Sequence, residues 1–137
     1  MRYTLQSTFD DVHQFEAELE KMLVNGKITK RTIFNIRLAF HEAIINVIQH
    51  TYKFSQSEKI IIEMNINRDY FECSIEDFGE PVNPEKIVPH KKNEIQTNGL
   101  GIFLYCKLMD EVEFSNTTSG NMLKLKKYFG SNDYESV

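Results

Sequence analysis

The chain has 137 residues, of which 41% are hydrophobic and 26% are charged, and its formal net charge is -4 at pH 7. These values indicate one globular domain with a hydrophobic core and exclude a chain that is disordered throughout. The charge offers no basic face for nucleic acid. There is no apolar run long enough to span a bilayer, no readable signal peptide and no metal-ligand spacing around Cys73 and Cys106. We therefore expect a cytoplasmic protein that binds neither nucleic acid nor a membrane.

The first third of the chain predicts one strand and two helices. Tyr3 and Leu5 alternate with polar residues, as in a short strand. Thr8 precedes apolar residues at helical spacing, and Asn25-Gly26 ends that helix. A longer helix is expected from about Thr29 to Tyr52, because two apolar stripes run along this segment.

The rest of the chain predicts two hairpins around a single helix. The expected elements are strands Lys59–Asn67 and Tyr70–Glu76, a loop Phe78–Asn98, a helix Ile102–Met109 opened by Gly99 to Gly101, and strands Val112–Asn116 and Asn121–Phe129. Because helices and strands segregate along the chain, we expect an α+β fold. It would be a two-layer sandwich whose mixed, mostly antiparallel sheet carries helices on one face. Residues 1–130 would form this single domain, and residues 131–137 would form a flexible C-terminal tail.

Three polar residues on the long predicted helix are the first candidate site. Glu42, Asn46 and His50 follow one another at i, i+4 spacing, so they stack along one side of the helix over roughly 12 Å. A carboxylate, an amide oxygen and an imidazole together can accept a proton and hold a hard cation. The alternative is an ordinary solvent-facing stripe on an amphipathic helix.

Asp77 is the second candidate. It shares the parity of Phe71, Cys73 and Ile75, so the period of a strand aims its carboxylate toward the apolar side. Such a group needs hydrogen-bond partners, because burying a bare carboxylate is costly. The alternative is a turn-forming Asp beyond the end of the strand, since Gly79 follows closely.

The third candidate is the segment from Thr97 to Ile102, which contains Gly99 and Gly101. Glycines at the start of a helix allow close backbone approach, and the free N–H groups there favour phosphate. The pattern matches neither the Walker A motif nor the dinucleotide-binding fingerprint. Taken alone, it is also compatible with a simple turn.

Together and in this order, these segments resemble the boxes of the GHKL, or histidine-kinase-like, ATP-binding superfamily. Glu42 to Tyr52 is similar to its asparagine box, and Gly99 to Val112 is similar to its second glycine box. Asp77 to Pro84 resembles the first glycine box in the form found in the anti-sigma-factor serine/threonine kinases. Ser119 to Leu125 resembles the closing hairpin. The resemblance spans nearly the whole chain and implies the Bergerat ATP-binding fold over residues 1–130.

The resemblance also implies ATP and Mg²⁺ as cofactors and a role for each candidate residue. Glu42 would be the catalytic base, Asn46 would coordinate Mg²⁺, and His50 would lie near the phosphates. Asp77 would accept a hydrogen bond from the adenine amino group, and Gly79 would make room for the base. The residues that would bind the phosphates are Asn98, Gly99, Leu100 and Gly101.

By the same resemblance, the chain would be a serine protein kinase that phosphorylates or sequesters a small regulatory partner. That partner would be an anti-anti-sigma protein of the STAS class, a sigma factor or both, and a homodimer is possible. The chain departs from the family pattern at Thr97, Asn98 and Asn121. These departures keep open a nucleotide-gated binding module without kinase activity, and a nucleotide-free interaction domain is the third reading.

Overall fold

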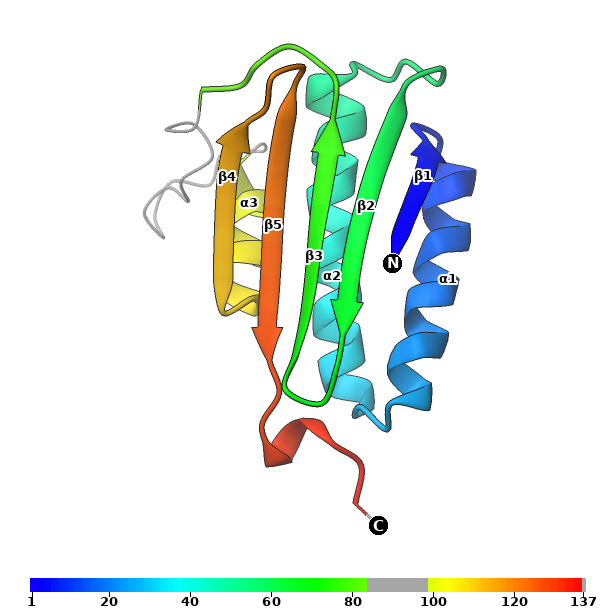
Figure 1. Ribbon diagram of the computed structural model, residues 1–137, viewed down its shortest axis with the longest axis vertical. Helices are drawn as coiled ribbons and strands as arrows, with labels where there is room; N and C mark the ends of the chain where they lie inside the picture. The colour runs from blue at the N-terminus through cyan, green and yellow to red at the C-terminus, as the bar shows by residue number, and fades with distance from the viewer. Residues whose placement is uncertain (84–98, 137) are drawn as a thin grey trace.

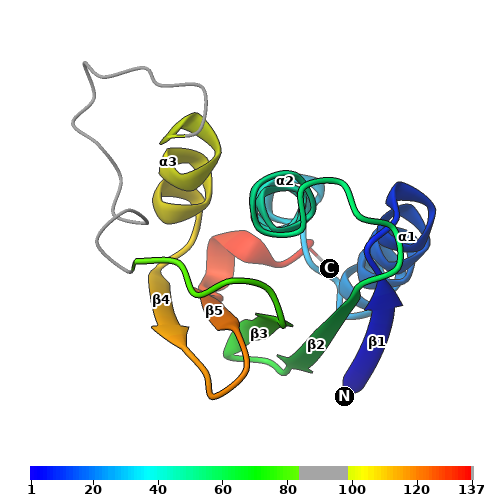
Figure 2. The same cartoon turned by 90° about the horizontal axis from the view of Figure 1, so that it is seen from above.

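The computed structural model describes residues 1–83 and 99–136 as two layers, one sheet and one set of helices (Figure 1). The strands are β1 (Arg2–Gln6), β2 (Lys59–Ile66), β3 (Tyr70–Asp77), β4 (Glu111–Asn116) and β5 (Asn121–Tyr128). The helices are α1 (Phe9–Asn25), α2 (Lys30–Asn46) and α3 (Gly99–Leu108), with a π-helical turn Val47–Thr51 and a 3₁₀ turn Ser131–Asp133. Viewed from above, α1, α2 and α3 all lie on one side of the sheet (Figure 2). The predicted α+β sandwich is confirmed.

The sheet has the strand order β1-β2-β3-β5-β4, and every pairing among the described residues is antiparallel. Residues of β3 alternate between buried and half-buried, with Phe71, Cys73 and Ile75 facing the helices. None of the helices formed by the described residues is long and apolar enough to cross a membrane.

Side-chain caps and apolar stripes together hold the helix layer on the sheet. The hydroxyl oxygens of Thr8 and Thr29 accept hydrogen bonds from the third following backbone N–H and so cap α1 and α2. The apolar stripes of both helices pack on the inward residues of β2, β3 and β5. The largest fully buried side chains include Leu19, Phe40, Ile44, Ile62 and Phe71.

The long helix predicted to Tyr52 changes its winding after Asn46. Residues Val47–Thr51 form a π-helical turn, and Lys53 and Phe54 then adopt positive φ angles of 50° and 64°, which ends the helix. The Tyr52 hydroxyl donates to Lys59 O and accepts from Phe78 N, so it ties this helix end to the ends of β2 and β3. The turn therefore reaches the edge of the sheet where β3 finishes.

The segment after β5 returns to the start of α2. Thr29 N donates to Asp133 O at 2.8 Å, the Thr32 hydroxyl donates to Asp133 Oδ1 at 2.7 Å, and Tyr134 forms a β-bridge with Ile28. This arrangement differs from the flexible tail predicted from residue 131. The reason is that Asp133 and Tyr134 find hydrogen-bonding partners far away in sequence, which local composition does not reveal.

Candidate functional site

A cavity of about 260 Å³ opens between the end of α2, the π-helical turn, α3 and the ends of β3 and β5. Its wall is mostly apolar, and a few polar groups converge on it. The apolar lining residues are Ala43, Val47, Ile75, Val82, Ile102, Tyr105, Phe114 and Leu123, and the polar ones are Asn46, His50, Thr51, Asp77 and Asn121. An apolar hollow with a small number of placed polar groups is the usual form of a small-molecule site.

Asp77 lies in the last position of β3 and is 3% exposed, so the strand has not ended before it. The inward orientation expected from parity is confirmed; the alternative is right that Asp77 bonds the turn that follows, and wrong that the strand ends before it. Its Oδ1 accepts hydrogen bonds from Gly79 N and from Asn121 Nδ2, both at 3.0 Å. Burial raises the pKa of this carboxyl above 3.8, while these two hydrogen bonds act to lower it. The two hydrogen bonds therefore offset part of the cost of burying the Asp77 carboxylate, which remains a hydrogen-bond acceptor in a mostly apolar wall.

Two glycines allow the backbone to close tightly around Asp77. A Cβ added to Gly79 would lie 2.3 Å from Cγ2 of Thr51, which belongs to the π-helical turn. A Cβ added to Gly120 would lie 2.0 Å from the Asp77 carbonyl oxygen. Neither glycine has a positive φ, so close approach is what requires the missing side chain. The contact with Thr51 explains why a side chain is excluded at Gly79, and the role of Gly79 in making room for the base is still a prediction.

The three stacked residues of the long helix reach the cavity unequally. Asn46 and His50 line it, the first from the end of α2 and the second from the π-helical turn. Glu42 is half-buried one turn earlier on α2 and is not among the lining residues. The structure thus brings Asn46, His50 and Asp77 together around one space and leaves Glu42 outside it.

The glycine-rich segment begins helix α3 at Gly99, so the backbone of Gly99, Leu100 and Gly101 forms the first turn of a helix. A helix opening at these glycines agrees with the prediction. Asn98 lies outside the described residues. The phosphate-binding role of all four residues is still a prediction.

Sequence reasoning treated Asn121 only as a departure from a family pattern, yet it is 1% exposed and donates to Asp77. A local signal was present, because Asn121 shares the strand parity of Leu123 and Leu125. An amide on the apolar face of a strand predicts a buried polar partner. The cavity wall formed by Val82, Tyr105 and Phe114 was also missed, since these residues are far apart in sequence.

The described residues contain no group of three His, Cys, Asp or Glu side chains that could hold a metal ion. The polar groups at the cavity do include Asn46, whose amide oxygen is a ligand that Mg²⁺ accepts. One amide oxygen cannot by itself bind Mg²⁺ firmly, because this ion prefers six oxygen ligands. The residues therefore fit a cation that arrives with a phosphorylated ligand and not a resident metal centre.

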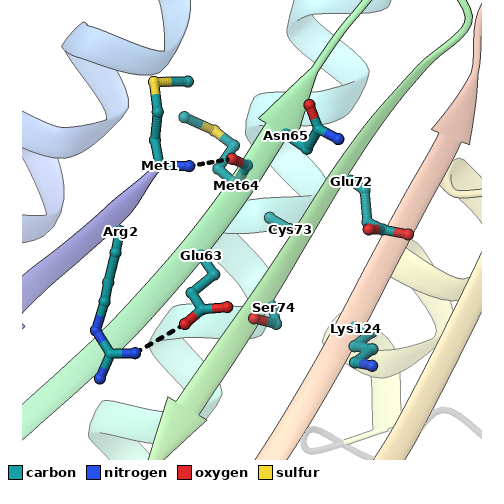
Figure 3. A pocket seen from close by; sticks show the side chains of 9 residues that line it. All are labelled: Met1, Arg2, Glu63, Met64, Asn65, Glu72, Cys73, Ser74 and Lys124. Carbon is teal, nitrogen blue, oxygen red and sulfur yellow. Dashed lines mark hydrogen bonds and ion pairs between the residues drawn. The ribbon is translucent and has the colours of Figure 1, made fainter.

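A second hollow, of about 440 Å³, lies on the open face of the sheet (Figure 3). Figure 3 shows Arg2 bonded to Glu63 and the amino group of Met1 bonded to the Met64 carbonyl, at 2.8 Å and 2.9 Å. The side chains of Arg2 and Glu63 are 61% and 57% exposed. Exposed pairs of this kind are well solvated and bring no buried acceptor to a ligand. We therefore take the smaller, covered cavity as the candidate site.

Comparison with known sequences assigns residues 5–127 to a family described as the histidine kinase-like ATPase domain. The serine-protein kinase RsbW of Oceanobacillus iheyensis is 32% identical over 112 residues, which cover 76% of this chain and 70% of that protein. RsbW of Staphylococcus aureus strain MW2 is 35% identical over 70% of this chain and 65% of its own length. RsbW of Bacillus subtilis is 29% identical, over 70% and 64%. The chain thus spans about two thirds of the length of these relatives.

Solved structures that share the fold include the following two. One contains the RsbU and RsbW domains of Rv1364c from Mycobacterium tuberculosis, with a TM-score of 0.67, 19% identity and coverage of 93% of this chain and 31% of that one. The other is the histidine kinase domain of the blue-light activated histidine kinase EL346 from Erythrobacter litoralis, with a TM-score of 0.58 and 14% identity. It covers 90% of this chain and 62% of that one. At these identities the likeness establishes the architecture alone.

Proposed function

The chain belongs to the histidine kinase-like ATPase family, and on this premise we propose that it binds MgATP and phosphorylates a serine of a small regulatory protein. The partner would be an anti-anti-sigma protein of the STAS class, and sequestration of a sigma factor would be the regulated output. We place this activity in the cytoplasm, with a homodimer as a possible working form. The relatives named serine-protein kinase support the class of reaction.

One observation carries the proposal: a buried carboxylate stands in the mostly apolar wall of the cavity. Adenine presents two flat aromatic faces and one amino group, and Asp77 is an acceptor for that amino group. Ile75, Val82 and Leu123 would contact the ring. A mostly apolar wall that carries one buried carboxylate favours a flat aromatic base with an amino group over a polar or branched metabolite.

The phosphates would extend from this cavity toward the first turn of α3, where the backbone N–H groups of a helix start are free to donate. Asn46 would hold Mg²⁺ through its amide oxygen, with phosphate oxygens and water as the other ligands. The bound ion would neutralise charge on the phosphates during transfer. His50, which is exposed at the rim, would lie on the same side.

Glu42 would act as the base that orients or deprotonates the incoming serine hydroxyl. Its place outside the cavity is compatible with this role, because the base must meet the protein substrate and not the adenine. Glu42→Gln retains size and removes most of the basicity, so transfer should fall by roughly 10²- to 10⁴-fold at saturating ATP while ATP affinity stays the same. The measurement is label transfer from ATP to the serine of the STAS-class partner, with Mg²⁺ present.

Glu63→Gln is the matched control, since Glu63 lies on the opposite face of the sheet and its loss should leave transfer unchanged. Undiminished transfer by Glu42→Gln would remove Glu42 from the role of base. Absence of transfer by the wild type, with ATP-dependent capture of the partner, would instead support a nucleotide-gated binding module. The feature that favours this second candidate is the departure from the family pattern at Thr97, Asn98 and Asn121.

A further inference from the structure

Three polar side chains stand in one row across the edge of β3, β5 and β4. The strand register pairs Asp77 with Asn121 and Asn121 with Asn116. Neighbours in such a row lie close enough for their side chains to interact directly. Leu123 follows Asn121 on the helix-covered face, so the central amide of the row points toward the cavity side of the sheet.

The amide of Asn121 has no hydrogen-bonding capacity left over. Its Nδ2 donates to Asp77 Oδ1 at 3.0 Å and to Glu80 O at 2.9 Å. Its Oδ1 accepts from Val82 N at 2.9 Å and from Asn116 Nδ2 at 3.0 Å. These four bonds use both donors and both acceptor sites of an amide. They also define its orientation, because exchanging oxygen and nitrogen would set an acceptor against the carboxylate of Asp77.

Asn116 completes the arrangement from the outer strand. Its Nδ2 donates to Val82 O at 3.0 Å as well as to Asn121 Oδ1. The N–H and the C=O of Val82 are therefore both held by side-chain amides, one from β5 and one from β4. Val82 lines the cavity, so the two asparagines determine the position of one piece of its wall.

The same network decides which oxygen of Asp77 is left for a ligand. Both of its hydrogen bonds, from Asn121 Nδ2 and Gly79 N, go to Oδ1. Among the described residues no hydrogen bond goes to Oδ2. Burial raises the pKa of Asp77, and the Asn121 bond is the strongest influence that lowers it, so this bond favours the ionised acceptor.

We propose that Asn121 is a positioning residue that makes this cavity selective for a purine with a 6-amino group. It holds the carboxylate of Asp77 by Oδ1 and directs Oδ2 to the amino group, while fixing Val82 beside the ring. The inference rests on the proposed function, since it assumes that the cavity receives adenine. The selectivity would then depend on Asn121, a residue that does not touch the base, as well as on Asp77.

The test compares ATP with purine riboside 5′-triphosphate, which is ATP without the amino group, by calorimetry. The wild type should prefer ATP by about 5- to 150-fold, the range expected when a buried acceptor loses its donor. Asn121→Asp keeps the shape and an acceptor for Val82 N but removes both donors. This variant should lose the preference by weakening ATP alone, while the affinity for purine riboside triphosphate stays unchanged.

Asn116→Ala is the matched control, because it removes two bonds of the network and leaves the donor to Asp77 in place. It should retain most of the preference for ATP. Asn121→Ser is the second variant, to be used if the aspartate disturbs folding, and it should also lose the preference. Equal weakening of both triphosphates would reveal a purely structural role and overturn the proposal, as would a preference retained in both Asn121 variants.

Amide hydrogen exchange without nucleotide separates this inference from the proposed function. If Asn121 positions Asp77, exchange at Gly79 N–H should accelerate in Asn121→Ser and stay slow in Asn116→Ala, because this N–H donates to Asp77 Oδ1. A wild type that binds neither triphosphate would refute the proposed function and the selectivity together. Unchanged exchange at Gly79 would refute the positioning role itself, whatever the protein binds.

Discussion

The two faces of strands β3 and β5 both carry polar side chains, but those on one face are buried and those on the other are open to water. On the helix-covered face, Asp77 and Asn121 are 3% and 1% exposed, and each has fixed hydrogen-bond partners. On the open face, Ser74 and Lys124 are paired by the register and line a hollow open to water (Figure 3). Ser74 is three positions from Asp77 and Lys124 is three positions from Asn121, yet water reaches one set and not the other.

This difference explains why the larger hollow is the poorer candidate. A polar group in water exchanges one set of hydrogen bonds for another at little net gain. A buried carboxylate must keep its partners, because an unpaired one costs far more than the bond is worth. A cluster such as Asp77 with Asn121 is thus retained against a stability cost, which favours a functional reason for it.

The strongest expected contrast between the faces is in ligand binding. Asp77→Asn should weaken ATP binding by about 5- to 150-fold, because an amide nitrogen placed toward the adenine amino group leaves two donors facing each other. Glu76→Gln, one residue away on the open face, should leave the affinity unchanged. Isothermal titration calorimetry with ATP and GTP measures both. Equal affinity of the wild type for ATP and GTP would contradict the role of Asp77.

Glycine substitutions should show how tightly the backbone is packed around Asp77, through their effect on the free energy of unfolding. Gly120→Ala should lower the free energy of unfolding by about 1–3 kcal/mol, because the added Cβ would press on the backbone of Asp77 and Phe78 and force the strands apart. Gly130→Ala is the control, since its Cβ would meet only an Asp133 oxygen at 3.8 Å. Urea unfolding of both variants is the measurement. Equal stabilities of the two variants would show that the backbone around Asp77 shifts at little cost to accommodate the added methyl group.

The stability cost of the buried carboxylate should itself be visible as a pH dependence. Because burial raises the folded-state pKa of Asp77 above 3.8, the folded state holds this proton more tightly than the unfolded state. Stability from this group is present below pH 3.8 and is lost as the pH rises through the folded pKa. Asp77→Asn should therefore melt at a higher Tm than the wild type at pH 7 and at a similar Tm near pH 3.5. A lower Tm for the variant at pH 7 would contradict this ordering.

The smallest effect is expected on the open face. Arg2→Ala should cost about 0–1 kcal/mol of unfolding free energy, because the Arg2–Glu63 pair is exposed and screened by salt. The difference from the wild type should shrink further at high ionic strength. Denaturant titrations at low and high salt test this. A loss of several kcal/mol that persists in high salt would mean that the open face is more tightly organised than its exposure suggests.

Sequence periodicity was sufficient for the elements and for part of the site. The period of two in β3 predicted that Asp77 faces the apolar side, and the 3.6-residue period of α2 aligned Asn46 and His50 along one face. Both predictions agree with the structure because they depend on residues within a few positions of each other. Residues 131–137 were predicted to form a flexible tail, because no local sequence pattern indicates the contacts that Asp133 and Tyr134 make with Thr29 and Ile28.

Sequence periodicity alone was enough to predict where most helices and strands lie and which side of a strand each side chain takes, but not the π-helical winding after Asn46. Which side chains become neighbours in the site was decided by the tertiary structure alone. The register of β3, β5 and β4 sets Asp77 beside Asn121 and Asn116, and the π-helical turn turns His50 and Thr51 toward the cavity while Glu42 stays outside it. The physical reason is that pairing and packing join residues far apart in the chain, such as Asp77 and Asn121 at 44 positions, and the energy of these contacts depends on the whole sheet being assembled.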